Sequence, residues 1–431
     1  GNGPVDLVTG LGTLSVSGTT AIAANVTSAG TQTYSGNVRI DDDAVLTTTD
    51  NTISFGGTVN SQAGETNDLT LNTGTASVSF TGAVGAVDSL DTLTITNTAA
   101  GVALPAVTAQ TLSISTAGAI TDNGALTIAG TTTLAAGAAN DITLDAANNF
   151  STVAITSGNN VTLNDTNGIV LGASTVSGTL DVTANGTITD TGALAVTGTT
   201  TLAAGAANDI TLDNANNFST VVVASGNNVT LNDTGAIDLG ASTVSGTLNV
   251  TANGAITDSG ALAVTGTTTL AAGAANDITL NNANNFSTVV ITTGNNVTLN
   301  DTNAIDLGAS TVSGTLGVTA NGAITDSGAL AVTGTTTLAA GAANNITLDA
   351  ANNFSTVAVT SGNNVTLNDT NGIILGASTV SGTLGVTANG SITDSGALTV
   401  TGTTTLAAGA ANDITLDAAN NFSTVVVTTG N

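Results

Sequence analysis

Apolar and polar residues alternate along most of the chain with a period of two. Runs such as Leu126-Thr127-Ile128, Val161-Thr162-Leu163 and Leu180-Asp181-Val182 place apolar side chains at positions i and i+2. This period is typical of short strands that bury one face. Glycine and asparagine separate the runs, as at Gly158-Asn159-Asn160, and both residue types favour tight corners. The pattern therefore predicts an all-β chain built from short strands.

The alternating pattern itself recurs with a constant 68-residue period. The segment that begins at Ala125 returns at Ala193, Ala261, Ala329 and Ala397, and every step has the same length (193 − 125 = 68). A long and regular period is typical of a solenoid, in which each unit contacts mainly its neighbours. We expect diverged β-helix coils in residues 1–124, continuous with tandem repeats in residues 125–431. The expected copies are 125–192, 193–260, 261–328, 329–396 and a partial copy at 397–431.

One repeat contains about nine strand-like segments, which we group into three coils of about 23 residues. We therefore expect a parallel β-helix (solenoid) that is three-sided, with the 68-residue repeat spanning three coils. The repeats also predict which side chains face inward. Position 170 is Val, and its equivalents are Asp238, Asp306 and Ile374, whereas both flanking positions stay apolar. Position 170 is therefore expected to face solvent and its neighbours the core.

Composition narrows the possible functions. The 431 residues include one Arg, no Lys, His or Cys, and 29 acidic residues, which gives a formal net charge of −28. Such a surface repels nucleic-acid phosphates. The chain also lacks the histidine, cysteine and lysine side chains that act as bases or nucleophiles in many enzymes. The apolar runs are far shorter than the ~20 residues that cross a bilayer. We expect no enzyme activity, no nucleic-acid partner and no membrane insertion in this segment.

Two sets of aspartates recur once per repeat and are candidate Ca²⁺ ligands, because Ca²⁺ binds oxygen donors. One set lies in Asn-Asp-Thr turns and comprises Asp165, Asp233, Asp301 and Asp369. The other set comprises Asp190, Asp258, Asp326 and Asp394. The alternative is that each carboxylate caps a turn by accepting hydrogen bonds from nearby backbone. Apart from this candidate ion, we expect no cofactor.

An Asn-Asn-Phe motif also recurs in every repeat. Its phenylalanines are Phe150, Phe218, Phe286, Phe354 and Phe422, in a chain with only seven Phe. We expect an asparagine corner followed by a phenylalanine that fills the core at a wide part of the coil. The alternative is a periodic binding platform with an exposed aromatic ring.

Three recurring motifs match the N-glycosylation sequon Asn-x-Ser/Thr. In the first repeat they are Asn149-Phe150-Ser151, Asn160-Val161-Thr162 and Asn164-Asp165-Thr166. Chance matches are expected in a chain this rich in Asn and Thr, so the motifs matter only where the source glycosylates its proteins.

Two stretches resemble the repeat regions of filamentous-haemagglutinin-like exoproteins and related bacterial surface β-helix proteins. They are Gly178-Thr179-Leu180-Asp181-Val182-Thr183-Ala184-Asn185-Gly186-Thr187-Ile188-Thr189-Asp190 and Thr33-Tyr34-Ser35-Gly36-Asn37-Val38. This resemblance implies a long right-handed β-helix that is exported and acts at the extracellular face of the cell, in many cases as an adhesin. The chain begins and ends within its pattern, so we expect it to be part of a larger protein.

These observations lead to three hypotheses. The first is a secreted, non-catalytic, cell-surface β-helical stalk of a haemagglutinin-like exoprotein, with structural and adhesive roles and a host surface or glycan as partner. The second is a self-assembling extracellular filament, sheath or matrix protein, in which copies stack end to end or side by side. The third is a repetitive polysaccharide-binding surface that acts through avidity.

Overall fold

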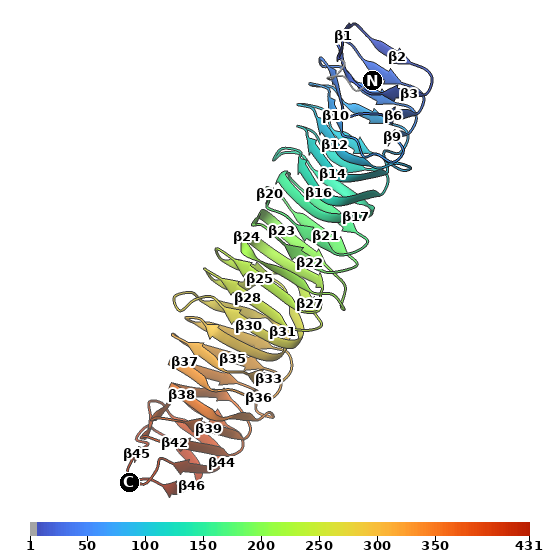
Figure 1. Cartoon of the computed structure of the whole chain (residues 1–431). Helices are drawn as coiled ribbons and strands as arrows, with labels where there is room; N and C mark the ends of the chain where they lie inside the picture. Colours follow the sequence, from blue (N-terminus) through green and yellow to red (C-terminus); the bar gives the residue numbers. More distant parts are fainter. Residues whose placement is uncertain (1–6) are drawn as a thin grey trace. The chain divides into compact units, whose positions relative to one another are not determined.

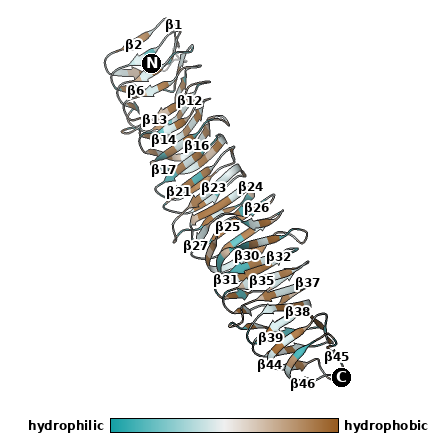
Figure 2. Cartoon of the chain, turned by 180° about the vertical axis from the view of Figure 1, so that it is seen from behind, coloured by the Kyte–Doolittle hydropathy of each residue, from teal (hydrophilic) through white to brown (hydrophobic). Residues whose placement is uncertain are grey.

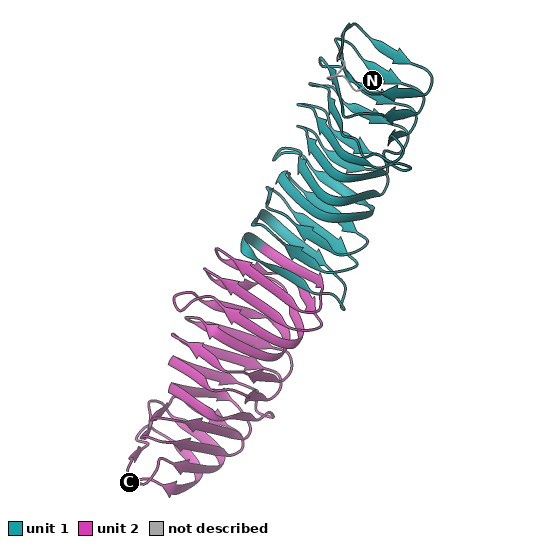
Figure 3. Cartoon of the chain, viewed as in Figure 1, with its two compact units in different colours: residues 1–219 teal, residues 220–431 magenta. Residues whose placement is uncertain are grey.

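A computed structural model describes residues 7–431 of the chain, and within these residues it contains strands but no helix (Figure 1). The strand pairings are parallel throughout both of its compact units, residues 1–219 and residues 220–431 (Figure 3). Each unit is a parallel β-solenoid, because its strands pair with strands of the coils before and after them. The predicted all-β parallel solenoid is thus confirmed, whereas its right-handed sense stays a prediction.

The period of two in the sequence becomes an alternation between core and surface. In β18 (Val161–Asp165) and β21 (Leu180–Ala184), every second residue is buried, and Figure 2 shows apolar and polar residues alternating along such strands. Ile169 and Leu171 in β19 (Ile169–Leu171) are 1% and 2% exposed, and Val170 between them is half-buried. The equivalents Asp238 and Asp306 are also half-buried and Ile374 is 38% exposed, so the inward and outward assignment is confirmed.

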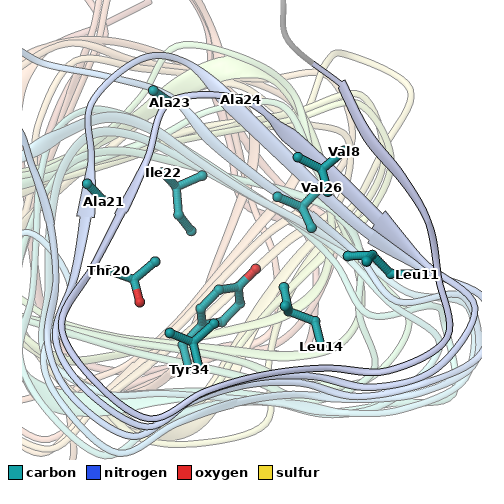
Figure 4. A pocket seen from close by; sticks show the side chains of 11 residues that line it. Val8, Leu11, Leu14, Thr20, Ala21, Ile22, Ala23, Ala24, Val26 and Tyr34 are labelled. Carbon is teal, nitrogen blue, oxygen red and sulfur yellow. The ribbon is translucent and has the colours of Figure 1, made fainter.

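The first coils have three sides. Strands β4 (Asn25–Ser28), β5 (Gln32–Tyr34) and β6 (Val38–Ile40) form one coil. They pair in order with β7 (Ala44–Thr48), β8 (Ile53–Phe55) and β9 (Val59–Ser61) of the next. Figure 4 shows side chains pointing inward from three sides of this region. Tyr34, Phe55 and Phe80 stack in its core with ring centroids 5.4 and 5.3 Å apart.

The ladder continues from the diverged coils into the tandem repeats. Strand β14 (Val107–Ser115) pairs with β16 (Leu126–Ala135), and β16 pairs with β17 (Ile142–Ser157). The expected boundary after residue 124 therefore falls between β14 and β16, two strands that pair in adjacent coils.

Coil length follows from the sequence separation of residues that pair. The separation ranges from that of Asn148 and Asp165 (165 − 148 = 17) to that of Ala44 and Leu69 (69 − 44 = 25). The expected coil length of about 23 residues lies within this range. Coils of the tandem repeats lie toward the short end, because three-residue corners such as 166–168 join their strands. The diverged coils include longer turns, for example residues 62–68.

The register also shows how far the coil turns within one repeat. A ladder is a row of strands that pair from one coil to the next, and each pairing is one step of one coil. In residues 220–431, seven such steps lead from Val229 to Val365. These two residues are 365 − 229 = 136 positions, or two repeats, apart. The steps are Val229–Leu248–Thr268–Val289–Leu307, then from Ile305 of the same strand Ile305–Ile324–Ile346–Val365. One repeat therefore contains the three expected coils and about a further half coil.

Because of this half coil, equivalent residues of consecutive repeats lie in different ladders. Thr268 and Thr404 belong to one ladder, whereas Thr336, which is equivalent to both, pairs with Leu316 and belongs to the other. Equivalent side chains of consecutive repeats thus alternate between two ladders of the coil.

Candidate functional site

A buried hydrogen-bonded cluster forms around the first asparagine of each Asn-Asn-Phe motif. Asn148 is 0% exposed, and its Nδ2 donates to Oδ2 of Asp122 at 2.7 Å and to the carbonyl oxygen of Leu144 at 3.2 Å. The Oδ1 of Asn148 accepts a hydrogen bond from the backbone N–H of Leu126 at 2.8 Å. The side chain therefore joins strands β15 (Ile120–Asp122), β16 and β17.

The same contact recurs in the later repeats and involves the second set of candidate aspartates. Asparagine Nδ2 and aspartate Oδ2 are 2.6–2.8 Å apart in the pairs Asn216–Asp190, Asn284–Asp258, Asn352–Asp326 and Asn420–Asp394. Both residue sets were predicted from the sequence as recurring polar positions, but their pairing was not. The 26-residue separation within each pair exceeds one coil of the tandem repeats, so sequence proximity gave no signal.

The first set of candidate aspartates lies on the other side of the motif. Asp165 is 1% exposed, its Oδ2 accepts the backbone N–H of Phe150 at 2.6 Å, and its Oδ1 accepts the N–H of Asn167 at 2.7 Å. Asp301 and Asp369 make the same two contacts in their repeats, and Asp233 accepts the N–H of Gly235 at 2.7 Å. These carboxylates cap their own turns, and Asp165, Asp301 and Asp369 also bond to a neighbouring coil.

The phenylalanines of the motif fill the core. Phe150, Phe218, Phe286 and Phe354 are each 2% exposed, whereas Phe422 in β46 (Asn421–Thr429) is partly buried. An exposed aromatic platform is therefore wrong for the first four repeats, because the ring points inward while Asn149 and Ser151 on either side of Phe150 point outward.

Burial changes the acidity of these carboxyls. Loss of hydration raises the pKa of five of them above the usual value, although hydrogen bonds to the charged form oppose the shift. The five are Asp122, Asp165, Asp301, Asp326 and Asp369. The exposed Asp141 behaves in the opposite way, because the backbone N–H and amide of Asn160 and the amide of Asn159 lower its pKa.

The geometry gives little support for a calcium centre. Within residues 7–431, no three acidic side chains gather closely enough to hold a metal ion. Both oxygens of Asp165 already accept backbone hydrogen bonds, so a cation would have to compete with these donors. The clusters are suited chemically to holding neighbouring coils together.

A shallow groove recurs on the surface beside the same motif. In one copy it is lined by Ala263, Val264 and Thr265 of β30 (Leu262–Ala271) and by Asn285, Phe286 and Ser287 of β31 (Ile278–Thr293). The equivalent residues line it at 195–197 with 217–219 and at 331–333 with 353–355. It lies where the pairing of β30 and β31 shifts register between Val264 and Thr267. The groove was not predicted from the sequence, although Gly266 within this strand was an available signal for a bulge.

A Thr-Thr-Thr triplet recurs once per repeat, and the burial of its middle threonine was not predicted from the sequence. Its side chain is completely buried, and among residues 7–431 its Oγ1 has no hydrogen-bond partner. The five copies are Thr132, Thr200, Thr268, Thr336 and Thr404. A buried hydroxyl without a partner destabilises a fold.

One known family matches this chain. The family described as repeats of unknown function (DUF5649) matches residues 90–157, 158–225, 226–293, 294–361 and 362–429. The first matched copy starts inside residues 1–124, so the repeat extends into coils that we described as diverged. No curated protein and no solved structure matches the chain. In the part of the chain that the structure describes, no helix has the length and hydropathy to cross a membrane.

Proposed function

The chain belongs to the DUF5649 repeat family, whose description assigns no activity, and we propose from its architecture that it is a non-catalytic stalk segment of a secreted cell-surface protein with structural and adhesive roles. In this proposal the tandem coils supply length and stiffness outside the cell. The resemblance of residues 178–190 to filamentous-haemagglutinin-like exoproteins supports the same localisation.

The observation that carries the proposal is the use of the recurring polar side chains. Asn148, Asp122 and Asp165 are all buried, and they bond to one another or to backbone of neighbouring coils. Side chains engaged in this way stabilise the stack and are poorly placed to act on a substrate. The acidic surface supports a solvated role, because like charges oppose close association of copies.

Electron microscopy of the purified chain tests the stalk proposal. We expect discrete rods whose length falls by about 17 Å when residues 261–328 are deleted, because about 3.5 coils at ~4.8 Å each are removed. The deletion joins equivalent positions of two repeats, so the coil pattern is preserved. Rods whose length does not depend on the number of repeats would contradict the proposal.

A self-assembling filament is the second candidate. Consecutive coils of each unit are joined by parallel backbone ladders, as where β42 (Leu384–Ala388) pairs with β44 (Leu398–Ala407). The same pairing between copies of the chain would join them end to end. Continuous filaments in the same micrographs, without gaps between chains, would favour this candidate over the stalk.

A further inference from the structure

The three recurring sequons occupy different environments in the folded chain. In the Asn-Val-Thr motif, Asn160 donates from Nδ2 to Asp141 at 3.1 Å, and its Oδ1 accepts the backbone N–H of Thr179 at 3.2 Å. In the Asn-Asp-Thr motif, Nδ2 of Asn164 donates to the carbonyl oxygens of Asp145 and Ala146 at 3.2 and 3.1 Å. Both amides are engaged between coils.

The later repeats show these contacts again. Asn296 donates to Asp277 at 3.1 Å, and Asn300 donates to the carbonyl oxygens of Asn281 and Asn282 at 3.2 and 3.0 Å. A sugar on Nδ2 of Asn300 would replace a hydrogen that the fold uses, and a sugar on Nδ2 of Asn296 would have to fit beside the hydrogen bond to Asp277. Asn300 would lose one of its two hydrogen bonds outright, because its amide has only two hydrogens.

The Asn-Phe-Ser motif is different. Asn285 and Ser287 are exposed while Phe286 is buried, so the acceptor amide and the hydroxyl of the sequon both face outward. The Oδ1 of Asn285 accepts a hydrogen bond from Asn303 at 3.1 Å, but its Nδ2 donates to none of residues 7–431. Asn285 and Ser287 also line the shallow groove, which leaves space beside the amide.

We propose that the exposed asparagine of each Asn-Phe-Ser motif is an acceptor for N-linked sugar. The five acceptors are Asn149, Asn217, Asn285, Asn353 and Asn421, all of which are exposed. In the reaction Nδ2 forms a bond to C1 of a hexose, and the bond from C1 to the diphosphate oxygen of a nucleotide-activated donor breaks. The diphosphate leaves with the bonding electrons, and the amide proton passes to a base of the transferase.

The half coil in each repeat sets the arrangement of the sugars in residues 220–431. Successive acceptors there alternate between the two ladders. Acceptors on the same ladder, such as Asn285 and Asn421, are therefore seven coils or about 34 Å apart. This inference is independent of the proposed stalk function, because it depends only on which amide is exposed and unbonded.

The test treats the full folded chain with UDP-glucose and a soluble asparagine glucosyltransferase, and maps the modified residues by mass spectrometry after cleavage at aspartate. The urea-unfolded chain, diluted into the same reaction, supplies the intrinsic sequence preference of the enzyme. We expect folding to reduce modification of Asn160, Asn164 and their equivalents at least tenfold, and to leave the Asn-Phe-Ser set modified within threefold of the unfolded chain.

The variant Ser287→Ala keeps the acceptor but destroys its sequon, so the folded product should lose one hexose, at Asn285 alone. Circular dichroism confirms that the variant is folded. Equal protection of all three motifs in the folded chain would overturn the proposal. Preferential modification of Asn160 or Asn164, or no modification of the folded chain at any of the five sites, would also overturn it.

Discussion

At the residue scale, the stability of each repeat depends on a few buried polar groups in an otherwise apolar interior. Asn148 satisfies a backbone N–H, a backbone carbonyl and a carboxylate with one amide. Thr132, equally buried, satisfies none among residues 7–431. The fold therefore contains, in each repeat, a buried amide that stabilises it and a buried hydroxyl that does not.

Replacing the buried asparagine should be costly. Asn284→Ala leaves the N–H of Leu262 without its partner and removes one of the two hydrogen bonds to Oδ2 of Asp258, which keeps the N–H of Asn282 at 3.2 Å. We expect a loss of about 1–3 kcal/mol in the free energy of unfolding, since a buried donor left without a partner costs roughly that amount. Amide hydrogen exchange at Leu262 should accelerate. The control Asn285→Ala changes the exposed neighbour and should stay within about 0.5 kcal/mol. Equal effects of the two substitutions would contradict this role.

Removing the unpartnered hydroxyl should have the opposite effect. Valine has nearly the shape of threonine, so Thr268→Val keeps the packing and removes a desolvated hydroxyl. We expect an increase of about 1 kcal/mol in the free energy of unfolding, and a larger rise in the midpoint of thermal unfolding when all five equivalent threonines are replaced. The exposed Thr265→Val serves as the control. A decrease in stability for Thr268→Val would show that its hydroxyl is bonded.

At the element scale, the strand bearing the register shift needs a residue without a side chain. A Cβ on Gly266 would lie 2.6 Å from the backbone oxygen of Gly246 in the neighbouring coil, whereas a Cβ on Gly317 would meet nothing closer than 3.8 Å. The two glycines therefore have different roles, although both lie in strands, Gly266 in β30 and Gly317 in β35 (Leu316–Ala320).

Alanine substitution separates these roles. Gly266→Ala should destabilise the chain by about 1–3 kcal/mol, because the backbone of the adjacent coil must move. Gly317→Ala should be neutral or stabilising by up to about 1 kcal/mol, since it reduces the freedom of the unfolded chain without a clash. Chemical denaturation of both variants checks the difference, and a tolerated Gly266→Ala would mean that the coils can separate locally.

At the scale of the whole molecule, charge dominates the response to pH. The chain has a net charge of −28, and five of its carboxyls, among them those of Asp165 and Asp301, have a raised pKa in the folded state. Protonation therefore favours folding at these groups. Their contribution is fully present below the unfolded-state pKa of about 3.8 and is lost as pH rises through the raised folded-state pKa. Asp141 and Asp277 act oppositely, and their contribution is lost as pH falls through their lowered pKa.

We expect the denaturation midpoint to be higher at pH 4 than at pH 7, because protonation of the carboxyls with a raised pKa favours the folded state and also relieves repulsion between like charges. Replacing Asp165, Asp301 and Asp369 together by Asn should reduce this pH dependence. Replacing the exposed Asp145, Asp181 and Asp349 provides a control with the same change of charge. A midpoint that falls on acidification would contradict the prediction.

The half coil per repeat can be measured directly in residues 220–431. The chain has no cysteine, so cysteines introduced in pairs are the only residues that a thiol-reactive spin label modifies. Suitable positions are Thr265, Thr333 and Thr401, which are exposed and equivalent in consecutive repeats. Labels at 265 and 401 should be about 34 Å apart along one ladder. Labels at 265 and 333 should be farther apart than the ~17 Å axial rise of about 3.5 coils, because they lie on different ladders. A separation of about 14 Å for this second pair would instead indicate a repeat without the half coil.

The sequence alone determined the strands, their inward and outward faces and the 68-residue period, because alternation is a local property that each residue pair carries. It also located the Phe that fills the core and both sets of aspartates. Only the tertiary structure decided that Asp122 meets Asn148, that Asp165 bonds to Phe150 of another coil, and that equivalent residues alternate between ladders. The length of each coil depends on the size of its corners, and the register depends on contacts between coils, which only the folded chain brings together.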